Sequence, residues 1–256
     1  MLRFAANLSM MFTEYPFLER FDRAAAAGFG AVEFLFPYDF EADEIRAALD
    51  RNGLAMALYN TYPGDWERGE RGLAALPGRG EEFRDAVKRA LDYAAVLKPS
   101  RIHIMAGIAG GPEVRRSYIE NLAWAAEAGE GQTLCIEPIN SRDMPGYHLA
   151  TSADAIGVLD AVGAGNLGLQ FDLYHAQIME GDLTRRMERL MPRIVHMQIA
   201  GVPDRHEPDT GEVNFVPLFA AMDQLGYDGF VGCEYRPKGR TEDGLGWMRT
   251  LLGDAG

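Results

Sequence analysis

The sequence predicts an α/β protein, a single (β/α)8 TIM barrel that spans residues 1–256. The chain has 256 residues, and α/β barrels commonly use about 250 residues as one domain. Eight short apolar or β-rich runs alternate with segments of helical periodicity, which is the order of parallel strands joined by crossover helices. Because no linker or change of composition divides the chain, we expect one domain.

The eight expected strands are residues 4–8, 31–36, 55–60, 101–107, 133–140, 167–175, 194–201 and 230–236. The clearest helical segments between them are residues 16–27, 41–52, 82–97, 114–128 and 152–162. Gly28, Gly53 and Gly226 follow helical runs, where the residue past a helix end often needs a positive φ. Eight such units in a chain of this length favour a closed barrel over an open sheet.

Composition excludes several classes of function. The formal net charge is −13, whereas nucleic-acid binding depends on a basic surface that neutralises phosphates. The two cysteines form no CxxC pair, and no apolar run approaches the roughly 20 residues that cross a bilayer. Because the first residues also lack the pattern of a signal peptide, we expect a cytoplasmic protein that binds a small molecule, not nucleic acid or a membrane.

The last four expected strands each carry a polar residue near their carboxyl end, where barrel enzymes build their active sites. These residues are Glu137, Asp172, Gln198 and Glu234. Ionisable groups embedded in apolar strands are costly to bury unless they are paired or bound to a metal. Three carboxylates and an amide oxygen favour a hard divalent cation, so we predict a Mg²⁺ or Mn²⁺ site.

Other residues near the strand ends are candidates for binding the substrate. His175 follows Asp172 by three residues and is expected to bind a substrate oxygen. Arg205, in the loop after the seventh strand, is expected to bind a carboxylate through two hydrogen bonds, with a salt bridge inside the loop as the alternative. The long connection 61–80 is expected to be a lid or binding loop. Glu33 is a further candidate for the pocket wall.

Several motifs are together specific for one family. They are RFAANLSM from Arg3, VEFLFPY from Val32, PGDW from Pro63, EPIN from Glu137, DRHEP from Asp204 and GCEY from Gly232. Here the chain resembles the hydroxypyruvate isomerase family within the xylose-isomerase-like barrels. The resemblance implies that Glu137, Asp172, Gln198 and Glu234 bind the metal and that Glu137 and Glu234 are the catalytic acid/base pair. The related ketose 3-epimerases carry a histidine in place of Gln198.

The resemblance implies an intramolecular oxidoreductase of carbohydrate metabolism. The expected reaction converts hydroxypyruvate to 2-hydroxy-3-oxopropanoate, also called tartronate semialdehyde, by proton transfer between the two glutamates through an enediolate. The first alternative is a 2-oxo-tetronate isomerase of four-carbon sugar acids, which the segments 9–14 and 198–205 favour. A ketose 3-epimerase is the second alternative, since it moves a proton on and off one carbon without shifting the carbonyl.

Two further classes stay open as rivals. A DNA-repair endonuclease on this type of barrel needs several histidines around zinc, and the chain has five histidines in total. A barrel that only binds sugar acids would tolerate the loss of Glu137 or Glu234. Barrels of this kind often self-associate as homo-oligomers, although no stripe in the sequence marks an interface.

Overall fold

The eight strands form a closed parallel barrel in the computed structural model, which describes residues 2–252. Neighbouring strands pair in chain order, and β1 pairs with β8 to close the barrel. The strands are β1 Arg3–Asn7, β2 Ala31–Glu33, β3 Ala55–Asn60, β4 Arg101–His103, β5 Leu134–Ile136, β6 Leu167–Asp172, β7 Ile194–Ile199 and β8 Phe230–Cys233. The predicted TIM barrel is confirmed. The single domain over 1–256 stays a prediction, since residues 1 and 253–256 lie outside the described ones.

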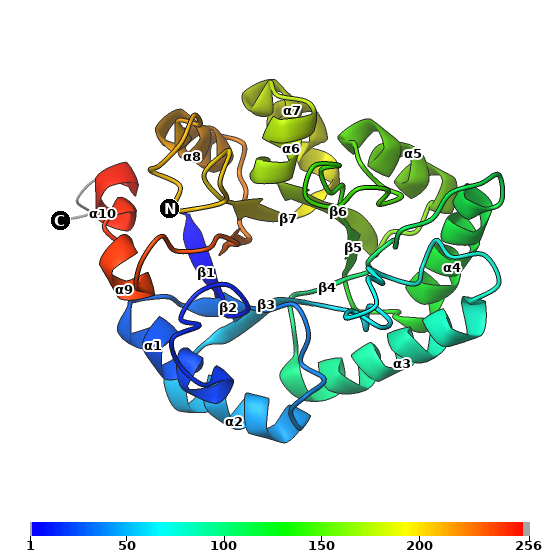
Figure 1. The fold of residues 1–256 in the computed structure, drawn as a ribbon, viewed down its shortest axis with the longest axis horizontal. Helices are drawn as coiled ribbons and strands as arrows, with labels where there is room; N and C mark the ends of the chain where they lie inside the picture. The colour runs from blue at the N-terminus through cyan, green and yellow to red at the C-terminus, as the bar shows by residue number, and fades with distance from the viewer. Residues whose placement is uncertain (1, 253–256) are drawn as a thin grey trace.

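The helices form a ring around the strands (Figure 1). They are α1 Arg20–Ala26, α2 Ala42–Asn52, α3 Gly80–Leu97, α4 Val114–Ala128, α5 Ser152–Val162, α6 Leu173–Met179, α7 Leu183–Leu190, α8 Phe215–Gln224, α9 Thr241–Gly244 and α10 Trp247–Leu252, with 3-10 turns at Phe17–Glu19 and Met191–Arg193. Gly28, Gly53 and Gly226 have φ values of 91°, 63° and 77° as predicted. Within the described residues, no helix is long and apolar enough to cross a membrane.

Most strands end earlier than the sequence predicts. The expected strand 167–175 stops at Asp172 because the Asp172 carboxylate accepts a hydrogen bond of 2.8 Å from the Tyr174 amide and caps α6. Such a cap satisfies an amide at a helix start that lacks a partner within the helix. The expected strands 31–36, 101–107, 133–140 and 230–236 likewise end at Glu33, His103, Ile136 and Cys233. Residues beyond these ends, such as Ile104 and Ile139, remain buried, so an apolar run does not mark the end of strand pairing.

A dry apolar layer lies between the barrel and its helices. It includes Trp247 of α10, which is fully buried. The Trp247 and Phe4 rings pack edge to face, with their centres 5.3 Å apart. The indole N–H of Trp247 donates a hydrogen bond of 3.0 Å to the Tyr235 hydroxyl. The C-terminal helix thereby packs against β1 and the chain after β8, the two segments that meet where the barrel closes.

Candidate active site

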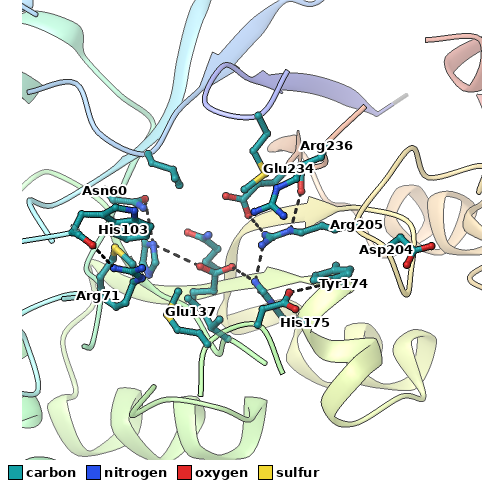
Figure 2. A pocket seen from close by; sticks show the side chains of 18 of the residues that line it. Asn60, Arg71, His103, Glu137, Tyr174, His175, Asp204, Arg205, Glu234 and Arg236 are labelled. Atoms are coloured by element: carbon teal, nitrogen blue, oxygen red, sulfur yellow. Dashed lines mark hydrogen bonds and ion pairs between the residues drawn. The ribbon is translucent and has the colours of Figure 1, made fainter. Parts of the chain in front are cut away.

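Three carboxylates converge at the carboxyl end of the barrel. Glu137 directly follows β5, Asp172 ends β6 and Glu234 directly follows β8. One donor atom from each of these residues and one from His175 all lie within 4.8 Å of one another, and the four side chains are buried. Figure 2 shows Glu137 between His103 and His175, with Glu234 and Arg205 above His175. The structure thus brings three of the four predicted metal ligands together.

Burial and mutual repulsion make these carboxyl groups weak acids. Burial, together with the charges of Glu234 and Asp172, holds the pKa of Glu137 well above its usual range. Burial raises the pKa of Glu234 to about 8 and that of Asp172 to about 6, although Arg205 opposes both shifts. Like charges held close together in a dry site favour the protonated form unless a cation compensates them. The cluster is therefore suited either to hold a proton or to hold a cation.

The donor set fits a divalent cation. Oxygen Oε1 of Glu137 is buried without a hydrogen-bond partner among the described residues. A buried polar atom in that state costs free energy that a bound cation would recover. Three carboxylates from three strands also match the preference of hard divalent ions for oxygen ligands. Glu137, Asp172, His175 and Glu234 therefore form a candidate metal site.

Arg205 is the cation that these carboxylates contact. Its Nη2 lies 2.6 Å from the Glu234 carboxylate and 3.3 Å from that of Asp172, and its Nε donates to the Glu234 carbonyl. The guanidinium also lies over the Tyr174 ring, 4.9 Å from its centre. The loop salt bridge to a neighbouring acid, the alternative considered from the sequence, is not among the ion pairs of the described residues. Carboxylate binding by Arg205 stays a prediction.

His175 has contacts within hydrogen-bond distance at both ring nitrogens. Its Nδ1 lies 3.3 Å from the backbone N–H of Asn140, which can only donate, so Nδ1 accepts. Burial and the charge of Arg205 hold the pKa of His175 well below its usual range, and a neutral imidazole has one N–H. Nε2 faces the carboxylates of Asp172 at 3.5 Å and Glu137 at 3.8 Å, and it also lies 3.4 Å from the donor Nη2 of Arg205. Binding of a substrate oxygen by His175 stays a prediction.

Gln198 lies next to the carboxylates in a buried polar network. Its Cα pairs with that of Asp172 in the β6–β7 register. Its Oε1 accepts a hydrogen bond of 2.7 Å from Gln170, and its Nε2 donates at 2.8 Å to Glu33. An amide oxygen keeps a second lone pair when it accepts one hydrogen bond, so ligation of a cation by Gln198 remains a prediction.

Glu33 is the centre of that network and does not line the main cavity. Its carboxylate contacts Nε2 of His196 at 2.7 Å and accepts from Asn7 at 3.1 Å, besides its bond from Gln198. A Cβ on Gly232 would lie 2.4 Å from both Glu33 carboxylate oxygens, so only glycine leaves room for this side chain. The network links β1, β2 and β7 below the carboxylate cluster.

Replacing Glu33 with leucine is expected to lower the free energy of unfolding by roughly 3–5 kcal/mol, because each buried donor left without its acceptor costs about 1–3 kcal/mol. The donors of Asn7, Gln198 and His196 would lose their shared acceptor in a dry barrel. Urea unfolding followed by circular dichroism measures the change, with exposed Glu120→Leu as the control. A loss below about 1 kcal/mol would mean that the network contributes little.

The main cavity has a volume of about 460 Å³ and opens above the carboxylates. His103, the last residue of β4, lines this cavity beside Asn60. Burial lowers the pKa of His103 to about 3, its Nδ1 lies 3.2 Å from the Asn60 oxygen, and its Nε2 is buried with no hydrogen-bond partner among the described residues. A neutral His103 therefore offers an acceptor to a hydroxyl group.

Trp66 and Arg71 also line the cavity, as expected for a binding loop at 61–80.

Comparison with known proteins agrees with this geometry. Residues 21–251 match the family model of the xylose isomerase-like TIM barrel. The chain is 57% identical over 259 residues to the 2-oxo-tetronate isomerase of Cupriavidus necator, covering 99% of this chain and 100% of that protein. It is 47% identical to the hydroxypyruvate isomerase of Escherichia coli, covering 97% of this chain and 98% of that protein.

A solved structure from Brucella melitensis, described as an AP endonuclease of family 2, superposes with a TM-score of 0.95. It is 52% identical in sequence and covers 98% of this chain and 99% of that one. The similarity extends along the barrel and includes the strands that carry the carboxylate cluster. The protein therefore belongs to the hydroxypyruvate and 2-oxo-tetronate isomerase family of xylose isomerase-like TIM barrels and is an isomerase of that family.

Proposed function

We propose that the protein is a divalent-cation-dependent 2-oxo-tetronate isomerase, which moves the carbonyl group of a four-carbon sugar acid between adjacent carbons. The observation that carries this proposal is the 57% identity to a 2-oxo-tetronate isomerase over the full length of both chains. The relative named for hydroxypyruvate is 47% identical. The comparisons thus favour the alternative substrate of the sequence analysis over hydroxypyruvate, which was the first expectation.

The two substrates share the reacting atoms. In both, a carbonyl at C2 adjoins a hydroxyl-bearing C3, and a 2-oxo-tetronate has one more hydroxymethyl group on C3. The proton on C3 leaves, an enediol forms, and a proton returns to C2 while the carbonyl appears at C3. A cavity of about 460 Å³ lies within the usual range of ligand sites and accommodates the extra group.

Glu137 and Glu234 are the proposed acid/base pair. They lie on non-adjacent strand ends, and both carboxyls have a raised pKa, that of Glu234 at about 8. A carboxyl group that exchanges its proton near neutral pH is efficient in general acid/base catalysis. One glutamate takes the proton from one carbon and the other delivers a proton to its neighbour, and the two roles interchange in the reverse direction.

The remaining residues of the site orient the substrate. We infer that His175 binds a substrate oxygen through Nε2 and that Arg205 balances the charge of Glu234 and Asp172. Glu137, Asp172, Gln198 and Glu234 would hold Mg²⁺ or Mn²⁺. When bound there, the cation supplies Lewis-acid polarisation of a carbonyl oxygen. The loop 61–80 limits the access of water to the cavity from the side of Trp66.

The endonuclease rival is less well supported for this chain. The carboxylate cluster contains one histidine among its four residues, whereas zinc clusters of nucleases use several nitrogen ligands. The net charge of −13 opposes binding of a polyanion. What the Brucella protein is described as doing therefore does not transfer to this one.

Steady-state kinetics on 2-oxo-tetronate and hydroxypyruvate tests the proposed substrate. We expect kcat/KM for the four-carbon acid to exceed that for hydroxypyruvate by about tenfold or more, because a site built to bind a hydroxyl discriminates against a substrate that lacks it. The measurement uses Mn²⁺-loaded protein and both enantiomers of the four-carbon acid. A preference for hydroxypyruvate would restore the three-carbon assignment, and no turnover of either acid would contradict the proposed function.

A further inference from the structure

Of the three arginines that line the main cavity, Arg205 is paired with carboxylates, whereas half-buried Arg71 and exposed Arg236 have no carboxylate partner among the described residues. Arg205 is paired with Glu234 and Asp172, as described above. Arg71 donates through Nη1 to the backbone carbonyls of Trp66 at 2.9 Å and Glu70 at 2.7 Å. Within the described part of the chain, its Nε and Nη2 have no hydrogen-bond partner and its guanidinium has no carboxylate partner. One edge of this guanidinium therefore remains available.

The Arg71 side chain is held in place by groups that do not neutralise it. Its guanidinium lies over the Trp66 ring, 3.7 Å from the ring centre. A cation–π contact fixes the position of an arginine but leaves its charge and its donors available. Two backbone carbonyls fix the Nη1 corner. The side chain is half-buried, so its charge is less screened than that of a fully exposed arginine.

The backbone next to Arg71 is fixed to the barrel. Gly72 has a φ of 124° and pairs with Ala106 after β4 in an antiparallel bridge. A Cβ on Gly72 would lie 2.4 Å from the Met105 carbonyl oxygen, so the close approach requires glycine. The Gly72 amide donates to the Pro63 carbonyl at 2.9 Å, and the Ala75 amide donates to that of Ala106 at 2.8 Å. The loop thus holds Arg71 at a defined place on the cavity wall.

The charges around the cavity indicate that binding a substrate carboxylate requires a cationic residue besides Arg205. Arg205 and one bound divalent cation would together balance the three carboxylates, which would leave no net positive charge to attract a substrate carboxylate. In the view of Figure 2, Arg71 lies with Asn60 and His103 on one side of Glu137, and Arg205 lies with Glu234 on the other. A substrate whose carboxylate met Arg71 would extend across the cavity toward the acid/base pair.

We propose that Arg71 binds the carboxylate of the substrate through its free Nε and Nη2 edge and so makes the enzyme select sugar acids over neutral ketoses. Guanidinium and carboxylate groups match in a planar pair of parallel hydrogen bonds. The inference rests on the proposed function, because it places a sugar acid in this cavity. Arg236, which also lines the cavity but is exposed, is the rival residue.

The test compares Arg71→Met, Arg71→Lys, Arg236→Met and the control Arg68→Met. Arg68 belongs to the same loop but has an 86% exposed side chain and pairs with Asp65. For each protein, KM and kcat are measured for 2-oxo-tetronate and for erythrulose, in which a hydroxymethyl group replaces the carboxylate. Calorimetry gives the dissociation constant of 2-oxo-tetronate, and paramagnetic resonance gives the affinity for Mn²⁺.

In Arg71→Met we expect KM and the dissociation constant for the acid to rise by at least about 30-fold, as for truncation of a hydrogen-bonded charge pair that the bound substrate covers. Its affinity for Mn²⁺, its kcat and any turnover of erythrulose should stay within about threefold of wild type, since the lost charge pair involves neither the metal ligands nor the acid/base pair. Lysine should restore part of the affinity, because it keeps the charge without the planar fork. Arg68→Met should match wild type.

Three results would overturn the proposal. In the first, Arg71→Met keeps the wild-type affinity for the acid. In the second, Arg71→Met loses as much affinity for Mn²⁺ as for the acid, which marks a purely structural role. In the third, Arg236→Met loses affinity for the acid and Arg71→Met does not. Failure of the proposed function looks different: the wild-type protein then binds 2-oxo-tetronate without turning it over, and the dissociation constants alone decide the role of Arg71. Wild-type protein that neither binds nor converts the acid contradicts both proposals.

Discussion

Replacing Glu234 with glutamine is expected to lower kcat for 2-oxo-tetronate by roughly 10²- to 10⁴-fold, the usual contribution of a general acid or base. Glutamine keeps the shape of the side chain but cannot carry the transferred proton. Glu234 lines the cavity within the carboxylate cluster, where its carboxyl group can exchange a proton with the substrate. Glu137→Gln should have an effect of the same order, because Glu137 belongs to the same cluster and lines the same cavity.

The two glutamates act in one proton transfer, so their effects should not add. We expect the double variant to be only slightly slower than the slower single variant. Exposed Glu212→Gln, on the loop after β7, is the matched control and should retain wild-type kcat. Circular dichroism and thermal unfolding check that the variants fold. Turnover within about tenfold of wild type in either folded single variant would remove that residue from the acid/base pair.

Removal of divalent cations is expected to abolish turnover, and Mg²⁺ or Mn²⁺ should restore it. A cation that binds only the folded protein also stabilises it, by about 2.7 kcal/mol at a concentration 100 times its dissociation constant. The mutual repulsion of Glu137, Asp172 and Glu234 in a buried cluster makes such stabilisation large. Thermal unfolding with and without Mn²⁺, beside kinetics on the same chelated samples, measures both effects.

Asp172→Asn tests whether Mn²⁺ stabilises the protein by binding at the carboxylate cluster. Asparagine can still cap α6 in place of the Asp172 carboxylate, since both residues are good helix caps. The variant should therefore fold, yet lose most of the Mn²⁺-dependent rise in unfolding temperature. Exposed Asp160→Asn should keep the full rise. Protein shown to be free of metal by elemental analysis, yet fully active, would contradict a role for a cation in turnover.

The barrel and most of the carboxylate cluster could be predicted because both follow from the local order of residues. Alternation of strands and helices specifies the barrel, and polar residues late in apolar strands specify its carboxyl end. The sequence places the end of β6 too late because Leu173 and Tyr174 continue an apolar run, whereas Asp172 caps the start of a helix. A cap and a strand end are difficult to distinguish when the capping residue is itself buried.

The partners of charged groups could not be predicted, because they depend on contacts between distant segments. Arg205 was assigned either to a substrate or to its own loop, yet it contacts Asp172 and Glu234, each about 30 residues away in the chain. The sequence does not mark Arg71, because it lies in a loop without helical or strand periodicity. The bridge from Gly72 to Ala106 fixes the neighbouring backbone to the barrel, and Arg71 lines the cavity.

The most direct test of the central claim follows the reaction in D₂O by proton and carbon NMR. Mn²⁺ broadens resonances, so Mg²⁺-loaded protein is incubated with 2-oxo-tetronate labelled with ¹³C at C2. The account predicts that the labelled carbonyl resonance is replaced by that of a hydroxyl-bearing carbon, with a new carbonyl at C3, and that Glu234→Gln stops this change. Deuterium exchange at C3 with the carbonyl still at C2 would contradict the account and indicate epimerase chemistry.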